Sequence, residues 1–191
     1  PVAQFASADD LAAQLGIELT ENEESRADAL LSLASGLIQD AARQTIELVE
    51  NETVVMRRAR GAVVLLAERP VVSVSSVLAG GDALAADTYY LDGDCLVRSG
   101  GTWGDLLGVG FSGNDELVVT YTHGYEEIPE TIKGICVAAV VRAWVNPGAV
   151  AQEGYGSERV VYPVQGMLLT AQERRALRKV TGRRSEPSAV Q

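Results

Sequence analysis

The chain has 191 residues and a formal net charge of −10, and 47% of its residues are hydrophobic. This length usually forms one domain, with room for a small inserted subdomain, and it suffices to bury a sizeable core. No apolar run is long enough to span a bilayer, and the N-terminus lacks a signal-peptide pattern. We therefore expect a product of the cytoplasm without a membrane partner.

Charge is distributed unevenly along the sequence. Residues 1–132 carry seven basic and twenty-two acidic side chains, whereas residues 133–191 carry nine basic and four acidic ones. An acidic body with a basic end indicates an assembly whose two ends contact different neighbours. Most of the basic excess comes from Arg174, Arg175, Arg178, Lys179, Arg183 and Arg184.

Two helices are predicted near the N-terminus. Ser7 can cap the first one, and Gly16 can end it in the left-handed conformation. Thr20 and Glu23 form a capping box that predicts the start of a longer helix, which ends near Arg43 or Gln44. The apolar stripe predicted for this second helix consists of Ala27, Leu30, Leu31, Ala34, Leu37, Ile38 and Ala41.

A β-rich segment follows. Alternating or short apolar runs predict strands at residues 53–58, 62–66, 71–78, 88–91, 95–98 and 116–122, separated by turn residues rich in glycine, aspartate and serine. Five or six short strands with frequent turns favour a small antiparallel barrel or sandwich. The glycine-rich residues 106–113 predict a loop.

The last predicted strand leads into a helix through a sharp corner. Val119, Tyr121 and His123 share one face of this strand, and Gly124 can take the positive φ that a corner requires. Pro129 suits the first turn of the helix, and Asn146-Pro147-Gly148 ends it. Its apolar stripe consists of Ile132, Ile135, Cys136, Ala139, Val140, Ala143 and Trp144, which we expect to pack against the stripe of the second helix and form the core.

The C-terminal region combines a strand and a helix. Residues 148–156 show no periodicity, and residues 157–162 predict a lone strand that needs a partner, within the chain or in an adjacent subunit. Thr170 and Glu173 form another capping box, which opens a helix through Ala176, Leu177 and Val180. Since it adds few apolar residues, we expect this last helix to contribute little to the core. Residues 185–191 are expected to be disordered alone.

The sequence offers little evidence of catalytic chemistry. His123 is the single histidine, and Cys95 and Cys136 form no CxxC pair, so reduced structural thiols are favoured over a thiol nucleophile, disulfide or metal site. Asp92 and Asp94 flank Gly93 as in a turn rather than a calcium loop. Trp103, on a predicted hairpin tip, either covers one end of the β-module or forms a contact hot spot. We predict no catalytic, cofactor or metal residues.

The segment Val-Thr-Tyr-Thr-His-Gly-Tyr-Glu-Glu-Ile-Pro-Glu-Thr-Ile-Lys resembles the head–tail connector (adaptor) proteins of long-tailed bacteriophages, and the order of elements over residues 7–180 fits the same family. The resemblance implies a virion neck protein that forms a ring, a dodecamer, under the portal protein. It further implies that the C-terminal segment reaches toward the portal through the six basic residues from Arg174 to Arg184 named above.

The sequence thus predicts an α+β fold, in which a small core of two long helices plus short terminal helices carries an inserted antiparallel β-barrel or sandwich-like module. The expected segments are N-terminal helices (1–52), the β-rich insertion (53–122), the core helix with the extended segment and last helix (123–180), which packs with residues 1–52, and a disordered basic tail (181–191). The function expected is that of a non-enzymatic ring that extends the DNA conduit and docks the next neck or tail protein, with genomic DNA passing through unbound. Alternatives are another neck or tail-completion protein, or a DNA-binding accessory factor that uses the basic helix.

Overall fold

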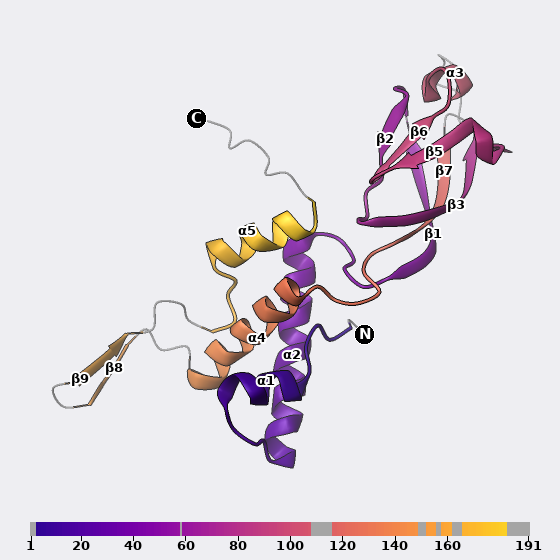
Figure 1. The fold of residues 1–191 in the computed structure, drawn as a ribbon. Coiled ribbons are helices and arrows are strands. Elements are labelled where there is room, and N and C mark those ends of the chain that lie inside the picture. The colour runs from indigo at the N-terminus through magenta and orange to yellow at the C-terminus, as the bar shows by residue number, and fades with distance from the viewer. Residues whose placement is uncertain are drawn as a thin grey trace, which may run out of the picture. The chain divides into compact units, whose positions relative to one another are not determined.

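The computed structural model describes residues 3–57, 59–107, 116–148, 152–155, 158–161 and 166–182, and for 152–155 and 158–161 it describes the backbone alone. The chain divides into two compact units, each considered by itself below (Figure 1). We call residues 1–43 and 127–191 the helical unit, and residues 44–126 the β unit. Because the β unit lies between the two pieces of the helical unit in sequence, it is an insertion, and the fold is α+β as predicted.

The N-terminal helices begin and end where their capping residues predict. Helix α1 spans Ala8–Leu15, with Ser7 and Asp10 in a capping box and Gly16 left-handed at the C-terminus. Helix α2 spans Glu21–Ala42. The backbone N–H and hydroxyl of Thr20 both donate to the Glu23 carboxylate, at 2.9 and 2.7 Å, so the predicted capping box is confirmed.

The core of the helical unit forms where α2 packs on α4, which spans Glu130–Val145. The Cys136 thiol lies 3.7 Å from the Ser35 hydroxyl and 3.9 Å from the Leu31 carbonyl oxygen, deep between the two helices. The predicted core pairing of these helices is therefore confirmed. The stripe of α2 is only partly buried, however: Leu37 and Ala41 are exposed, and Ser35 and Ala42 are buried in their place.

The last helix, α5 (Ala171–Val180), belongs to the core, contrary to the expectation that it contributes little to it. It packs on both α2 and α4. Leu177 is completely buried, and Leu169 and Thr181 at its two ends are also buried. The expectation failed because one large apolar side chain, supported by buried flanking residues, is enough to hold a ten-residue helix in place.

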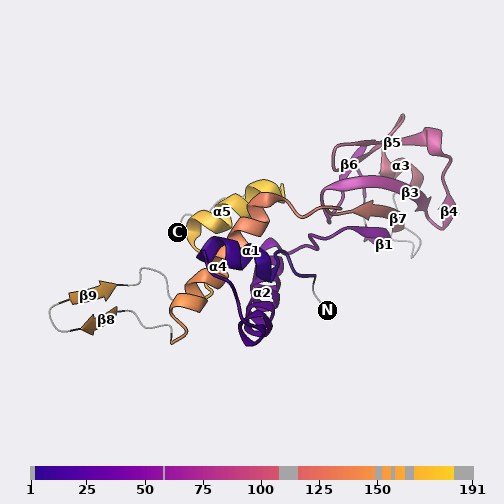
Figure 2. The ribbon, with the colours of Figure 1, turned by 60° about the horizontal axis from the view of Figure 1, so that its bottom comes forward.

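The strand predicted near residues 157–162 is not a lone strand. Strand β9 (Glu158–Val161) pairs antiparallel with β8 (Gln152–Tyr155), which the sequence did not predict because its residues are mostly polar and do not alternate. The partner therefore comes from the same chain. Figure 2 shows the two strands side by side as a separate hairpin.

The β unit contains two antiparallel sheets. The first has the order β1-β7-β3-β4, and the second the order β2-β6-β5. The sheets do not close into a barrel, so the sandwich alternative holds. All six predicted strands are present, and the short β4 adds a seventh; their bounds are Val49–Arg57 (β1), Val63–Leu65 (β2), Val71–Ala79 (β3), Asp82–Ala83 (β4), Tyr89–Asp92 (β5), Cys95–Arg98 (β6) and Glu116–His123 (β7).

Strand β7 organises the larger sheet, since it lies between β1 and β3. Its residues alternate strictly between half-buried and buried, with Val119, Tyr121 and His123 on the buried face as predicted. At its end Gly124 has φ +92°, and a Cβ there would lie 2.1 Å from the Glu47 carbonyl oxygen. Glycine is therefore required twice at this corner, for its conformation and for the close approach of the backbone.

A short helix that the sequence did not predict completes the β unit. After a 3₁₀ turn at Ala86–Thr88 and strands β5 and β6, helix α3 spans Trp103–Leu107. Residues 106–107 were expected to be loop, and residues 108–113 of that loop lie outside the described residues. Trp103 is completely buried in a cluster with Leu66, Leu96 and Leu117, among others. This burial matches the packing role considered for Trp103 and disagrees with a contact hot spot, because the ring presents no surface to a partner.

The β unit begins at Gln44, before the expected boundary at residue 53. The Gln44 side chain donates to the Arg69 carbonyl oxygen at 2.6 Å, and the Thr45 N–H donates to the Glu68 carboxylate at 2.9 Å. Ile46 is completely buried. These contacts attach residues 44–46 to the β unit before its first strand begins.

Candidate interaction surfaces of the helical unit

Helix α5 is strongly amphipathic. At 100° per residue, Arg174, Arg175, Arg178 and Lys179 fall on one face, and Glu173, Leu177 and Val180 fall on the other. All four basic side chains are exposed. Arg178 and Lys179 also lie in the last turn, where the helix dipole favours positive charge. The structure thus brings four of the six predicted basic residues together, and Arg183 and Arg184 lie outside the described residues.

The buried side of α5 is held by an ion pair with α4. The Arg142 guanidinium donates to both oxygens of Glu173, at 2.9 and 3.1 Å, and the two side chains are only 21% and 15% exposed. The Thr170 N–H donates to the same carboxylate at 2.7 Å. Burial by itself raises the pKa of Glu173, but the hydrogen bonds from Arg142 and Thr170 outweigh it and the pKa lies below its usual value. The basic face is therefore fixed in orientation relative to α4.

We expect Glu173→Gln to lower the free energy of unfolding by about 1–3 kcal/mol at pH 7, because it removes a nearly buried charge-assisted pair. Folding lowers the pKa of Glu173 from its unfolded-state value of 4.5, so the ionised carboxylate stabilises the folded state at pH values above 4.5. This stabilisation disappears as the pH falls through the lowered pKa. Thermal melting from pH 7 to pH 3 should show the two proteins converging in acid. The double variant R142Q/E173Q is the control, and a gap that persists at pH 3 would contradict this explanation.

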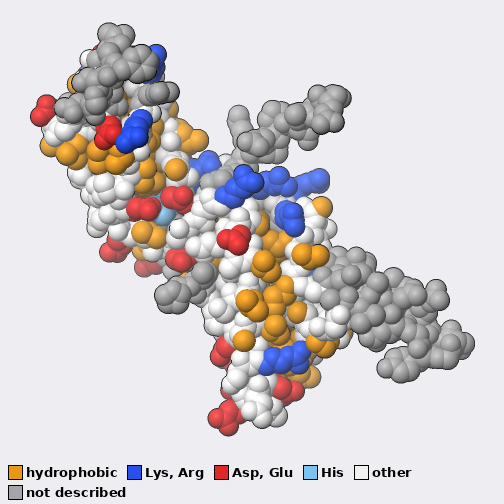
Figure 3. All heavy atoms as spheres, turned by 180° about the vertical axis from the view of Figure 1, so that it is seen from behind, with side chains coloured by type: hydrophobic (Ala, Val, Ile, Leu, Met, Phe, Trp, Pro, Cys, Tyr) orange, Lys and Arg blue, Asp and Glu red, His pale blue; other side chains and the backbone are white. Residues whose placement is uncertain are grey.

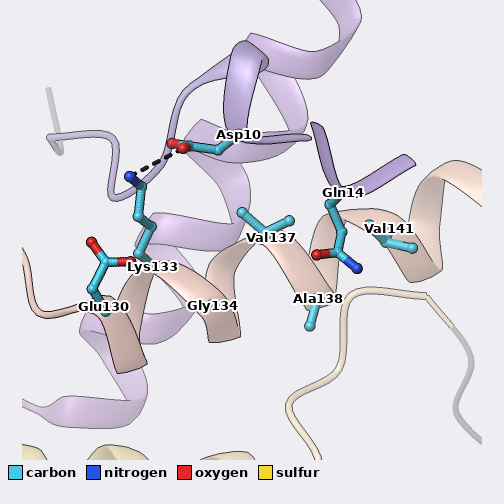
Figure 4. A pocket seen from close by; sticks show the side chains of 8 residues that line it. All are labelled: Asp10, Gln14, Glu130, Lys133, Gly134, Val137, Ala138 and Val141. Carbon is cyan, nitrogen blue, oxygen red and sulfur yellow. Dashed lines mark ion pairs between the residues drawn. The ribbon is translucent and has the colours of Figure 1, made fainter. Parts of the chain in front are cut away.

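A groove of about 410 Å³ opens between α1 and α4 (Figure 4). Asp10 and Gln14 of α1 line it together with Lys133 and Glu130 of α4, and its apolar lining, Gly134, Val137, Ala138 and Val141, comes entirely from α4. The Lys133 ammonium lies 3.0 Å from the Asp10 carboxylate. The hydrogen bond to Asp10 raises the pKa of Lys133. The lining offers apolar area and a charged end formed by Asp10, Glu130 and Lys133, and it includes no Ser, Thr, Cys or His.

The single histidine and the two cysteines of the sequence lie within strands and helices of the fold. His123 is completely buried; its Nε2 lies 2.6 Å from the Glu52 carboxylate, and its ring centroid lies 5.3 Å from that of Tyr121. Burial raises the pKa of the Cys136 thiol, which makes the reactive thiolate rarer. Cys95 is half-buried on β6. In the described ranges, no three His, Cys, Asp or Glu side chains gather closely enough to hold a metal ion.

Sequence reasoning found the basic face and missed the groove. The groove depends on how α1 lies across α4, which no residue spacing reveals. The start of the unpredicted helix α3 had a signal, however, because Thr102 and Asp105 form a small capping box. The Thr102 N–H donates to the Asp105 carboxylate at 2.7 Å, and the Asp105 N–H donates back to the Thr102 hydroxyl at 3.2 Å. Among the described helices, none is long and apolar enough to cross a membrane.

No family model matches this sequence, and no curated protein matches it either. Solved structures do match. One similar chain lies in the neck of an empty GTA (gene transfer agent) particle, computed with C6 symmetry; it is 14% identical, and the match has a TM-score of 0.52 and covers 91% of this chain and 92% of that chain. Another lies in the neck of a native GTA particle, computed with C12 symmetry, with 15% identity, coverage of 78% and 81%, and a TM-score of 0.45. At this level of identity, the chain shares its fold with a neck component of a phage-like particle.

Proposed function

We propose that this chain is a structural protein of a virion neck: a head–tail connector that forms a ring under the portal, extends the DNA conduit and docks the next neck or tail protein. The observation that carries the proposal is the end-to-end likeness in fold to a chain from a particle neck, over 91% of this chain and 92% of that one. The match includes both units and their order, so it does not rest on one common motif.

The symmetry of that neck supports a ring. The structure containing the similar chain was computed with C6 symmetry, and a ring of twelve copies satisfies six-fold symmetry. Rings arise when one surface of a subunit binds a different surface of the next and the rotation closes. We propose a dodecamer of this chain in the neck.

The basic face of α5 is the proposed portal-docking surface, through Arg174, Arg175, Arg178 and Lys179, with Arg183 and Arg184 in the tail beyond it. Four exposed cations on a helix that is itself anchored by Leu177 and Glu173 make a rigid positive surface. Such a surface suits an acidic partner. Charge complementarity of this kind mainly orients the partner and speeds its association, and it adds less to the affinity.

The net charge of −10 suits a conduit for DNA. Acidic side chains facing a channel repel phosphate groups, so the genome slides through without binding. The same four cations on α5 also favour the alternative, a DNA-binding accessory factor. In that case the affinity for duplex DNA should fall steeply with salt, because each phosphate contact releases a counterion.

The experiment is reconstitution with the portal protein of the same particle. We expect the free chain to be monomeric or weakly associated, and to form a closed ring on the portal, because the template raises the local concentration of subunits. Light scattering of the free protein and electron microscopy of the portal complex measure the two states. A tight two-fold dimer that does not bind portal would contradict the connector function, and salt-dependent binding of duplex DNA without portal binding would establish the alternative.

A further inference from the structure

Strand β1 forms a long edge of the β unit. It lies at one end of the larger sheet, whose strand order is β1-β7-β3-β4. It is nine residues long, whereas the other edge strands of the β unit, β4, β2 and β5, have two, three and four residues. The free N–H and C=O groups of an edge readily pair with a further strand, and proteins limit this by keeping edge strands short. Strand β1 lacks that protection.

The hydrogen bonds of β7 determine which residues of β1 carry the free groups. The Gly80 N–H donates to the Glu116 carbonyl oxygen at 3.0 Å, so Glu116 directs its backbone groups toward β3. Backbone groups alternate in direction along a strand, so Val119, three positions on, bonds to its partner Val54 on β1. The residues of β1 that direct their N–H and C=O groups away from the sheet are therefore Thr53, Val55 and Arg57. No other described residue is bonded to these groups.

The chain protects only the beginning of this edge. A β-bulge interrupts the pairing with β7 just before Glu52, where Asn51 has a φ of +52°, and bulges discourage further pairing. From residue 53 to residue 56 the strand has neither a charge nor a proline, and Val55 is 50% exposed. Figure 3 shows hydrophobic side chains on the surface of the β unit. Residues 53–57, which we call the open edge of β1, are thus suited to bind one further strand.

The hairpin of β8 and β9 lacks a third strand. Its two strands form a sheet of their own, which no other described strand joins. A two-stranded hairpin by itself is at best marginally stable in water, whereas a sheet of three or more strands can be stable. Each strand of the hairpin has four residues, which matches the length of the open edge of β1.

The hairpin is also long enough in its connections to reach a neighbouring subunit. Gln152 follows Gly148, the last described residue after α4, by four positions. Since an extended chain spans at most about 3.6 Å per residue, the hairpin can begin up to about 14 Å from that point. Packed helices lie about 8–10 Å apart, so this reach extends beyond the surface of the hairpin's own helical unit.

A ring requires a contact between two unlike surfaces, because a contact between two equal surfaces closes into a two-fold dimer. Pairing the open edge of β1 with the same edge of another copy would give such a dimer. Pairing it with the hairpin of another copy joins unlike surfaces, and each subunit keeps its own hairpin for a further neighbour. Within one chain, β1 and the hairpin belong to separate sheets.

We propose that the β8–β9 hairpin of one subunit adds to the open edge of β1 in the next copy of this chain, so that a shared β-sheet joins neighbouring subunits of the ring. The inference rests on the proposed ring and names its subunit contact. The occupant of the edge is a second copy because the chain itself contains both an edge without a partner and a hairpin without a third strand. The contact uses no residue of the basic face of α5, which stays available for the portal.

Proline substitution tests the open edge with a matched control. Proline has no N–H, and a strand tolerates it where the N–H would face away from the sheet, as that of Val55 does. We therefore expect Val55→Pro to keep the melting temperature of the free chain within about 3 °C and to lower the yield of rings on portal at least about tenfold. Val54→Pro removes a hydrogen bond to β7 and should instead lower the melting temperature of the β unit by at least about 10 °C. A folded Val55→Pro that forms rings at the wild-type yield would overturn the proposal.

Cysteine cross-linking identifies the partner while leaving the backbone of the edge unchanged. In a Cys95→Ser background, which keeps the buried Cys136, the variants Val55→Cys and Val160→Cys are prepared separately and as a double variant of the full chain. A short bismaleimide is added to each protein and to the mixture of the two single variants, free at high concentration and on portal. We expect covalent dimers in the mixture and a ladder of oligomers in the double variant, with neither single variant cross-linked to itself.

Cross-linking of either single variant to itself would overturn the proposal, because it would pair edge with edge or hairpin with hairpin. A double variant that is cross-linked only within one chain would also overturn it, since the hairpin would then bind its own β1. Rings seen by electron microscopy without any cross-link between copies would overturn the interface and leave the neck function standing. If neither rings nor cross-links form, free or on portal, the interface and the neck function both fail. A ladder without portal binding would keep the interface and count against the neck function.

Amide hydrogen exchange gives a readout on the unmodified chain. The N–H groups of Val55 and Arg57 have no partner within the described chain, so they should exchange rapidly in the free protein and at least about tenfold more slowly in the ring on portal. The N–H of Val54, which is bonded to β7, is the internal reference and should change much less. Equal exchange at Val55 and Arg57 in the free protein and in the ring would contradict the interface.

Discussion

Replacing Trp103 with alanine is expected to unfold the β unit at a temperature about 15–30 °C lower, while the helical unit stays intact. Trp103 is one of the largest completely buried side chains and lies in the core cluster that holds Leu66, Leu96 and Leu117. Removing a buried tryptophan typically costs about 3–5 kcal/mol, and a unit of this size loses several degrees for each kcal/mol. The cost falls on one unit because the two units have separate cores.

Amide hydrogen exchange measures this effect unit by unit. The amides of β7 should lose protection in Trp103→Ala, whereas those of α2 and α4 should keep it. Trp103→Phe is the matched control: it keeps most of the ring, and it removes an indole N–H that has no hydrogen-bond partner among the described residues. Trp144→Ala is the converse control, since the half-buried Trp144 packs in the helical unit beneath Arg26. Retained protection of β7 in Trp103→Ala would show that the cluster does not depend on this side chain.

Local signals in the sequence predicted most of the fold. The alternation along β7, the capping boxes at Thr20 and Thr170, and the turn at Gly93 between β5 and β6 each depend on residues close together in the chain. Those interactions are decided within a few positions, so their sequence patterns are specific. The basic face of α5 follows in the same way from helical spacing.

The features that the sequence did not predict depend on distant contacts or on weak patterns. Leu37 has the spacing of a core residue, but the described residues of the helical unit leave it 43% exposed. Conversely, α5 looked too polar to join the core, and Leu177 is nevertheless buried. Strand β8 is polar, so it gave no signal, and the groove on α4 exists only because α1 packs beside it. The candidate surfaces are thus less predictable than the elements that carry them.

Replacing the four cations of α5 with glutamine (R174Q/R175Q/R178Q/K179Q) should weaken attachment to the portal by about 30- to 1,000-fold without lowering the melting temperature. Exposed charge pairs contribute about 0.5–1 kcal/mol each, and every 1.4 kcal/mol corresponds to a factor of ten in affinity. The fold should persist because Leu177 and the Arg142–Glu173 pair lie on the other side of the helix and are unchanged. Truncation before α5 would be a poorer test, since it would also remove Leu177 from the core.

The measurement is a portal-binding titration at several salt concentrations, alongside thermal melting. Attachment of the wild-type chain should weaken as salt rises, and the residual attachment of the glutamine variant should depend on salt much less, because its charges no longer take part. The variant R174K/R175K/R178K keeps every positive charge and should therefore bind portal nearly as well as the wild type, unless bidentate arginine contacts are required. Duplex DNA binding is measured in parallel by fluorescence anisotropy. If the glutamine variant binds portal unchanged but loses DNA binding, the basic face would instead be assigned to nucleic acid, because phosphates would then be its partners.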